Sequence, residues 1–237
     1  KRVYMLFDWN ADTIRWYTDA EAYSGFYKKI AGTITPWLRG YQTLCDLGCG
    51  PGLFSFEAAP HFDRVECIDL SEAALRSIKE RAAQQGFTNI STRLEDAYQF
   101  TGSWDVIYMS FFGSREPDRF LPMCRKLIAV VSDTSESELF PMKERRYKRN
   151  TADETAQYLN EKGMQYRLTH RQLEFGQPFK SLEDARRCIR YYVPDLSDSE
   201  IDSFLNTRLE KIRGEVWSYY LPRMKSVGIF ELDGRLG

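Results

Sequence analysis

Residues 43–53 have the sequence TLCDLGCGPGL, in which a short apolar run ends near an aspartate and three glycines follow within five positions. The run from Thr43 to Leu47 has the composition of a buried strand. Gly48, Gly50 and Gly52 lack a Cβ, so they permit tight turns and let a ligand approach the main chain directly. We therefore expect a strand, a turn at which a carboxylate or phosphate could sit, and a helix.

Beyond this turn, short β-type runs alternate with amphipathic helices, as in a sheet wound with crossover helices. The longer of these helices begins after Ser71 and ends at Gly86, where a residue with positive φ is easily placed. This alternation predicts an α/β fold with a doubly wound sheet. The expected strands are 43–47, 65–70, 89–94, 105–110 and 127–132, and the first helix is 54–59.

The C-terminal part is expected to add two strands and more helices. Thr151 and Glu154 have capping-box spacing at the start of a helix that Gly163 closes. Strands at 165–175 and 227–232 would form an antiparallel terminal hairpin, with a long insertion between them. Two helices are expected in that insertion: one capped by Ser181 and Asp184, and one capped by Ser197 and Glu200 and bearing Ile201, Phe204, Leu205, Leu209 and Ile212.

The N-terminal forty residues form a further helical segment, with Tyr23, Phe26, Tyr27 and Ile30 at helical spacing. We expect an N-terminal helical cap at 1–40, a ligand-binding core at 41–175, a helical lid at 176–224 and the last core strand at 225–237.

The run from Asp46 to Gly52, an acidic residue followed by Gly-x-Gly-x-Gly, resembles the first motif of the class I S-adenosylmethionine (SAM)-dependent methyltransferases. The resemblance implies a Rossmann-like fold with a seven-stranded, mostly parallel sheet, and S-adenosylhomocysteine (SAH) as a product. Asp46 would meet the ligand ammonium, Asp69 the ribose hydroxyls, and Asp96 the adenine amino group. The cofactor-binding residues expected on this basis are Asp46, Gly48, Cys49, Gly50, Gly52, Asp69, Leu70, Glu95, Asp96, Ala97 and Ser110.

Two other interpretations of the glycine run stay open at this point. In one, the glycines only make a tight turn and the aspartates cap helices. In the other, the chain binds a nicotinamide or flavin dinucleotide. That class requires Gly-x-Gly-x-x-Gly, and Leu53 stands where its third glycine should be.

No catalytic group is fixed by the sequence, because methyl transfer from a sulfonium mainly needs alignment and exclusion of water. A base helps only if the acceptor loses a proton. By residue type alone the candidates are Tyr17, Tyr23 and His170, with Tyr108, Tyr191 and Tyr192 behind them. Phe111, Phe112, Arg146 and Tyr191 are predicted to contact the acceptor. The run Ser110-Phe111-Phe112 lacks the Asn/Asp-Pro-Pro-aromatic pattern of adenine-N6 methyltransferases.

The overall charge favours a small-molecule acceptor. Lys and Arg number 33 against 34 Asp and Glu, so the chain has no field that would draw in a polyanion. An RNA or protein methyltransferase that uses the basic 143–149 loop is one alternative. A SAM-binding sensor or assembly subunit without turnover is another.

The remaining expectations concern the protein's surroundings. No run approaches the roughly 20 apolar residues of a membrane span, and no signal-peptide pattern begins the chain, so we expect a cytoplasmic protein. The five cysteines lack paired metal-ligand spacing, which predicts reduced thiols and no metal. Both a monomer and a homodimer are compatible with the sequence.

Overall fold

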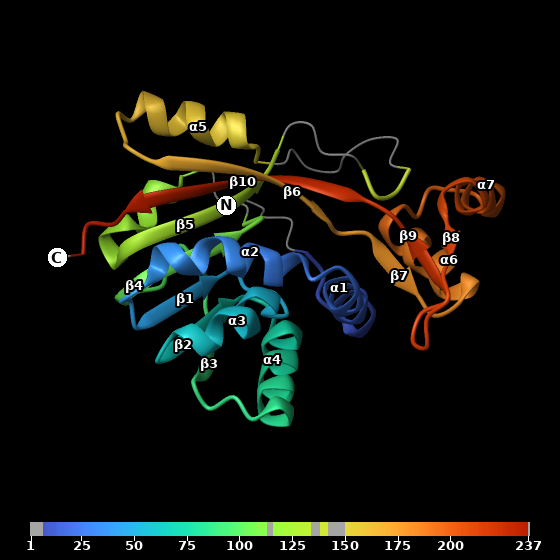
Figure 1. Ribbon diagram of the computed structural model, residues 1–237, viewed down its shortest axis with the longest axis horizontal. Helices are drawn as coiled ribbons and strands as arrows, with labels where there is room; N and C mark the ends of the chain where they lie inside the picture. Colours follow the sequence, from blue (N-terminus) through green and yellow to red (C-terminus); the bar gives the residue numbers. More distant parts are fainter. Residues whose placement is uncertain (1–6, 113–115, 134–137, 142–149, 237) are drawn as a thin grey trace.

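A seven-stranded sheet forms the centre of the protein in the computed structural model, which describes residues 7–112, 116–133, 138–141 and 150–236 (Figure 1). The strand order is β3-β2-β1-β4-β5-β10-β6, and only β10 runs against its neighbours. The predicted α/β fold with an antiparallel end is therefore confirmed. The strands are β1 Thr43–Leu47, β2 Arg64–Asp69, β3 Ile90–Leu94, β4 Trp104–Ser110, β5 Cys124–Ser132, β6 Arg167–Glu174 and β10 Met224–Asp233.

Helices cover both faces of this sheet. One face carries α2 Phe26–Ile34, α3 Leu53–Ala58 and α4 Glu72–Gln85, and α5 Ala152–Glu161 lies on the other (Figure 1). Thr151 caps α5 as predicted, because its side chain accepts a hydrogen bond from the Glu154 N–H. Short 3₁₀ turns complete the layers: η1 Thr35–Leu38, η2 Ala59–His61 and η3 Pro117–Met123.

The N-terminal segment is two helices rather than one. Gly25 has φ +62°, so α1 Ala11–Ser24 ends there and α2 begins at Phe26. The break separates residues that the sequence placed on a single face. Tyr23 packs on Tyr220 of the C-terminal insertion, whereas Phe26 packs into the core of the main sheet.

The insertion contains a second, three-stranded sheet that the sequence analysis missed. Its order is β7-β9-β8, with β7 Gln177–Phe179, β8 Glu210–Lys211 and β9 Tyr219–Leu221. Strands of two or three residues are too short to show an alternating pattern. The expected helices are present as α6 Leu182–Tyr192 and α7 Asp198–Arg208. The second was predicted too long, because Leu209 adopts extended backbone and the next two residues pair with β9.

A separate apolar core holds α1, the insertion and its small sheet together, with Trp16, Phe179, Ile189 and Leu205 among its buried members. Arg15 reinforces the contact, because its guanidinium lies 2.5 Å from the Asp184 carboxylate. Trp16 Nε1 donates to the same carboxylate at 3.2 Å. None of the helices in the described ranges is long and apolar enough to cross a bilayer.

Candidate cofactor-binding site

The glycine loop connects β1 to α3 at the carboxyl edge of the sheet. Gly48, Gly50 and Gly52 have φ values of +71°, +52° and +66°, a backbone region that side chains rarely adopt. This edge, where β1 lies between β2 and β4, is where open α/β sheets bind ligands. The sequence therefore placed the loop correctly.

The loop N–H groups already have partners within the protein. Gly48 N–H donates to the Ile68 carbonyl at 2.8 Å, Gly50 N–H to the Asp69 carboxylate at 2.8 Å, and Gly52 N–H to the Cys49 carbonyl at 2.9 Å. This differs from the expectation of a ligand carboxylate or phosphate at these groups. The glycines act here through the space that their missing side chains leave. A pyrophosphate, which needs such donors, does not suit the loop.

Asp69 ends β2 and fastens the loop. One carboxylate oxygen accepts from the Gly50 N–H and the other from the Ser71 N–H at 2.9 Å. Burial raises the pKa of Asp69, and these two hydrogen bonds oppose the shift. Each oxygen keeps a second lone pair, so the carboxylate retains the acceptor capacity that two ribose hydroxyls require.

Asp46 lies deeper in the site, at 2% exposure. The Ser55 hydroxyl of α3 donates to its carboxylate at 2.5 Å, and the Cys67 thiol lies 3.1 Å from that hydroxyl. Burial raises the pKa of Asp46 to about 7. Cys49 is half-buried and lies beside the Cys67 thiol. Because burial removes this carboxylate from water, a nearby ammonium group would stabilise its ionised form.

Two aromatic rings lie directly on the loop. A Cβ built on Gly50 would be 2.6 Å from Trp9 Cζ2, and one built on Gly48 would overlap the Phe112 ring. Trp9 comes from the segment before α1 and packs 5.0 Å from the Tyr17 ring. The N-terminal segment therefore covers the mouth of the loop.

The residues expected at the adenine lie past the ends of β2 and β3. Leu70 is 45% exposed and offers an apolar side chain there. Glu95 pairs with Arg93 at 3.2 Å. Asp96 accepts from the Tyr98 N–H at 2.9 Å, and Ala97 is buried. The adenine subsite stays a prediction, and the structure shows that Asp96 caps a turn.

Hydroxyl groups gather where β4 ends. Ser110 lies beside the buried phenols of Tyr27 and Tyr108, and burial raises the pKa of both phenols well above the ordinary value. Within the described residues the Tyr108 hydroxyl has no well-aligned hydrogen-bond partner, although Ser110 is close. Asp46 of β1 is the register partner of Tyr108 of β4, so these hydroxyl groups lie next to the Asp46 carboxylate at the glycine loop.

The acceptor and base candidates are scattered. Tyr17 lies at the site through its contact with Trp9. Tyr23 packs against Tyr220 in the insertion, and exposed His170 pairs with Asp133 at 3.0 Å. Tyr191 is 38% exposed and donates to Asp8 at 2.9 Å. Of the other candidates, Tyr192 packs on Phe140, and Arg146 and the basic 143–149 loop lie outside the described residues.

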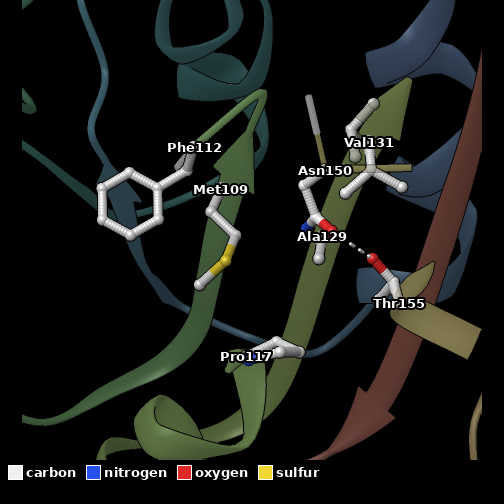
Figure 2. A pocket seen from close by; sticks show the side chains of 8 residues that line it. Met109, Phe112, Pro117, Ala129, Val131, Asn150 and Thr155 are labelled. Carbon is white, nitrogen blue, oxygen red and sulfur yellow. Dashed lines mark hydrogen bonds between the residues drawn. The ribbon is translucent and has the colours of Figure 1, made fainter. Parts of the chain in front are cut away.

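Phe111 and Phe112 diverge to opposite faces of the sheet. Phe111 joins the core beneath α2, and Phe112 joins the core on the α5 side. Figure 2 shows the pocket beside Phe112, where the Thr155 hydroxyl donates to Asn150 at 3.2 Å. The pocket has room for about one water molecule, which is too little for an acceptor.

Sequence reasoning missed two residues that touch the loop. One is Trp9, and the other is Arg81 on α4, whose guanidinium donates to the Pro51 carbonyl and lies 3.9 Å from the Phe56 ring centroid. Burial lowers the pKa of Arg81 to about 10. An arginine on a helix usually lies on a solvent-exposed face, so its residue type gave no signal. The one available signal was that Arg81 follows Ile78, which packs under Gly52, at i,i+3 spacing and therefore lies on the same side of α4.

The site fits a nucleoside that carries an amino acid better than a dinucleotide. The loop N–H groups already have acceptors within the protein and do not suit a phosphate, whereas Asp46 is suited to an ammonium, Asp69 to a ribose and Leu70 to an apolar ring face. SAM combines these groups in one molecule and carries the reactive methyl group on its sulfonium.

Comparison with known proteins agrees with this fit. The family described as a methyltransferase domain matches residues 44–133. YcgJ from Bacillus subtilis superposes at a TM-score of 0.54 with 12% identity, over 89% of this chain and 99% of its own. No curated protein matches the chain in sequence.

Two named methyltransferases have the same fold. Precorrin-6y C5,15-methyltransferase from Geobacter metallireducens has a TM-score of 0.50 and 11% identity, over 87% of this chain and 88% of its own. Magnesium protoporphyrin IX methyltransferase from Synechocystis, with SAH bound, has a TM-score of 0.50 and 14% identity, over 96% of this chain and 90% of its own. Residues 44–133 therefore form a methyltransferase domain, in a chain that has the fold of SAM-dependent methyltransferases, enzymes that use SAM and release SAH.

Proposed function

We propose that the enzyme methylates a small molecule held at the carboxyl ends of β4 and β5. The observation that carries this proposal is a cluster of aromatic side chains that four separate segments bring together at that edge. Phe26 of α2 stacks on Phe175 at 4.5 Å between ring centroids and lies 6.2 Å from Phe111. Tyr17 of α1 packs edge-on against Phe175 at 5.9 Å.

An aromatic cluster beside the cofactor loop favours a small acceptor over a polymer, because small-molecule sites are lined mainly by apolar and aromatic side chains. The net charge of −1 adds no attraction for a nucleic acid backbone. Precorrin-6y C5,15-methyltransferase and magnesium protoporphyrin IX methyltransferase are both named for small-molecule acceptors, which further supports this choice.

In this proposal the cofactor lies along the loop, with Asp46 at its ammonium, Asp69 at its ribose and Leu70 beside its adenine. Glu95, Asp96, Ala97 and Ser110 would complete the binding site. Residues 176–224, together with α1, would act as a lid that excludes water while the methyl group passes in line from sulfur to the acceptor atom. Among the base candidates, Tyr17 and Tyr108 lie beside this site.

The proposal is tested by following tritiated methyl groups from SAM into three fractions of a cell extract: metabolites of low mass, RNA and protein. Incorporation into the low-mass fraction by the wild-type enzyme, and much less by Asp69→Ala at the same SAM concentration, is the expected result. Label that enters RNA and is released by ribonuclease, or label that enters protein, would replace the small-molecule proposal by one of its alternatives.

A further inference from the structure

The space above the middle glycine of the cofactor loop is filled by a side chain of the protein itself. A Cβ built on Gly50 would lie 2.6 Å from Trp9 Cζ2 and 2.9 Å from Trp9 Cε2, whereas carbon atoms in contact are about 3.5 to 4 Å apart. The Trp9 ring therefore lies against the Gly50 backbone and leaves no room for a ligand atom between them. A cofactor that approaches the loop at Gly50 must displace this ring.

Trp9 belongs to a short strap, residues 7–10, that directly precedes α1. The strap ends at Asn10, whose side chain accepts hydrogen bonds from the N–H groups of Asp12 and Thr13 and so caps the helix. The Asn10 N–H in turn donates to the Thr13 hydroxyl at 2.9 Å. This cap fixes the first turn of α1, so the residues before it can change position while the helix stays in place.

Helix α6 of the insertion holds the strap against the loop. The Tyr191 hydroxyl donates to the Asp8 carboxylate at 2.9 Å, and the Asn10 side-chain amide donates to the same carboxylate at 2.9 Å. The next residue of α6, Tyr192, has its ring centroid 6.2 Å from that of Phe7. Both hydrogen bonds to the Asp8 carboxylate are exposed to water, which replaces them readily, so the strap is held by contacts that are individually weak.

The two rings that cover the loop differ in how firmly they are held. Phe112 directly follows β4 and packs against the core on the α5 side of the sheet. Trp9 is half-buried, and its ring centroid lies 4.4 Å from that of Phe7 in the same strap and 5.0 Å from that of Tyr17. Trp9 is therefore the ring that can leave the loop without disturbing the main sheet.

From these contacts we propose that residues 7–10 form an autoinhibitory strap, in which Trp9 occupies part of the cofactor site of the ligand-free protein and Tyr191 is the latch that keeps it there. SAM and SAH bind only after the strap moves away, so the closed fraction of molecules lowers their apparent affinity. Because the latch belongs to the insertion, the position of α6 controls how readily the cofactor enters. The inference concerns the cofactor site alone and does not depend on the nature of the acceptor.

The rates at which SAH binds and leaves, measured by surface plasmon resonance on the immobilised protein, test the strap. Trp9→Ala removes the ring from Gly50 and should speed SAH association about fivefold or more, while the dissociation rate stays within about twofold, so that the affinity rises. A side chain that only lined the cofactor site would do the opposite, because its loss would speed dissociation and weaken binding. Trp37→Ala removes a half-buried tryptophan of η1, before the start of β1, and is the matched control that should change neither rate.

Two further variants test the latch. Tyr191→Phe removes the latch hydroxyl and keeps the ring, and Asp8→Ala removes the carboxylate that accepts from it. Each should speed SAH association about threefold without changing dissociation, in line with the loss of exposed hydrogen bonds. The double variant should be no faster than Asp8→Ala alone, because both changes break the same contact. Tyr166→Phe removes a phenol hydroxyl on the α5 side of the sheet, where the ring packs on Phe230, and should change neither rate.

An association rate that Trp9→Ala leaves unchanged or slows would overturn the inference, and so would faster dissociation with a lower affinity, which would make Trp9 a wall of the cofactor site. Wild-type rates in Tyr191→Phe would refute the latch. Circular dichroism checks the fold of each variant, and Trp9→Leu replaces Trp9→Ala if the latter does not fold. The labelling experiment reports separately on the small-molecule function, because label in RNA or protein changes the acceptor and leaves the rates of SAH binding as the test of the strap.

Discussion

The Asp69 carboxylate accepts a hydrogen bond from the Gly50 N–H at 2.8 Å, so the residue expected to hold the ribose also holds the glycine loop. Asp69→Ala should therefore weaken SAH binding by about 1.5 to 3 kcal/mol, since a charged acceptor is lost and the loop is released. Asp69→Asn keeps one acceptor oxygen, so its affinity for SAH should lie between those of the wild type and Asp69→Ala. Isothermal titration calorimetry measures both, and an unchanged affinity of the alanine variant would refute this role for Asp69.

Asp46 should make the stability of the ligand-free protein fall as the pH rises. Its pKa is raised to about 7 in the folded chain, against an ordinary value near 4. Between these values the folded state holds a proton that the unfolded state has lost, so the free energy of unfolding decreases, by at most about 4 kcal/mol.

Asp46→Asn removes this titration, so urea unfolding at pH 5 and pH 8 should give more similar free energies for the variant than for the wild type. The exposed Asp63→Asn serves as the control for a lost aspartate. A pH dependence that survives in Asp46→Asn would contradict the assignment.

The same carboxyl should make cofactor binding depend on pH in the opposite direction. If the ammonium of SAH binds ionised Asp46, the affinity should fall about tenfold from pH 8 to pH 6, as the group takes up its proton. 5′-Methylthioadenosine lacks the amino-acid tail and is the control ligand. Calorimetry at pH 6 and pH 8 measures the affinity of each ligand. The same pH dependence for SAH and 5′-methylthioadenosine would exclude Asp46 as the ammonium partner.

Trp9 should report cofactor binding by its fluorescence. Its ring covers Gly50 so closely that a Cβ there would be 2.6 Å away, and a ligand that reaches the loop must change its surroundings. SAH should alter the emission of the wild-type enzyme, which has five tryptophans, and Trp9→Phe should remove most of that change while binding persists in calorimetry. An undiminished signal in the variant would assign it to another tryptophan.

Arg81 should be needed for a well-ordered loop. Arg81→Met removes the donor to the Pro51 carbonyl and should weaken SAH binding about tenfold, or ~1.4 kcal/mol. Arg76→Met removes an exposed arginine of the same helix and should leave the affinity unchanged. Equal effects of the two substitutions would point to charge alone rather than to the contact with the loop.

The sequence predicted best what lies on consecutive strands. Glycines after one strand and an aspartate at the end of the next must lie at the same edge of a parallel sheet, which is why the glycine loop and Asp69 could be expected at one site. Trp9 and Arg81 come from a preceding segment and from a helix. Only the folded chain shows that they meet near this edge.

Local exceptions account for the other differences. A single left-handed residue, Gly25, divides the N-terminal helix, and Tyr23 is thereby turned away from the core. The N–H groups of the glycine loop were expected to face a ligand, but carbonyls and the Asp69 carboxylate accept from them instead. Hydrogen-bond partners of this kind depend on the register between strands, which spacing along one strand does not reveal.

The insertion is joined to the main sheet at two adjacent points, where β6 passes into β7 and β9 passes into β10. At this junction the Phe175 N–H donates to the Arg223 carbonyl at 2.9 Å, and Arg223 Nε donates back to the Phe175 carbonyl at 3.0 Å. Gly176 has no room for a side chain, because a Cβ there would meet the Leu221 carbonyl and the Tyr220 hydroxyl. Two strands hydrogen-bonded side by side resist twisting and sliding, so we expect residues 177–221 to move most easily as a unit that rocks about this junction.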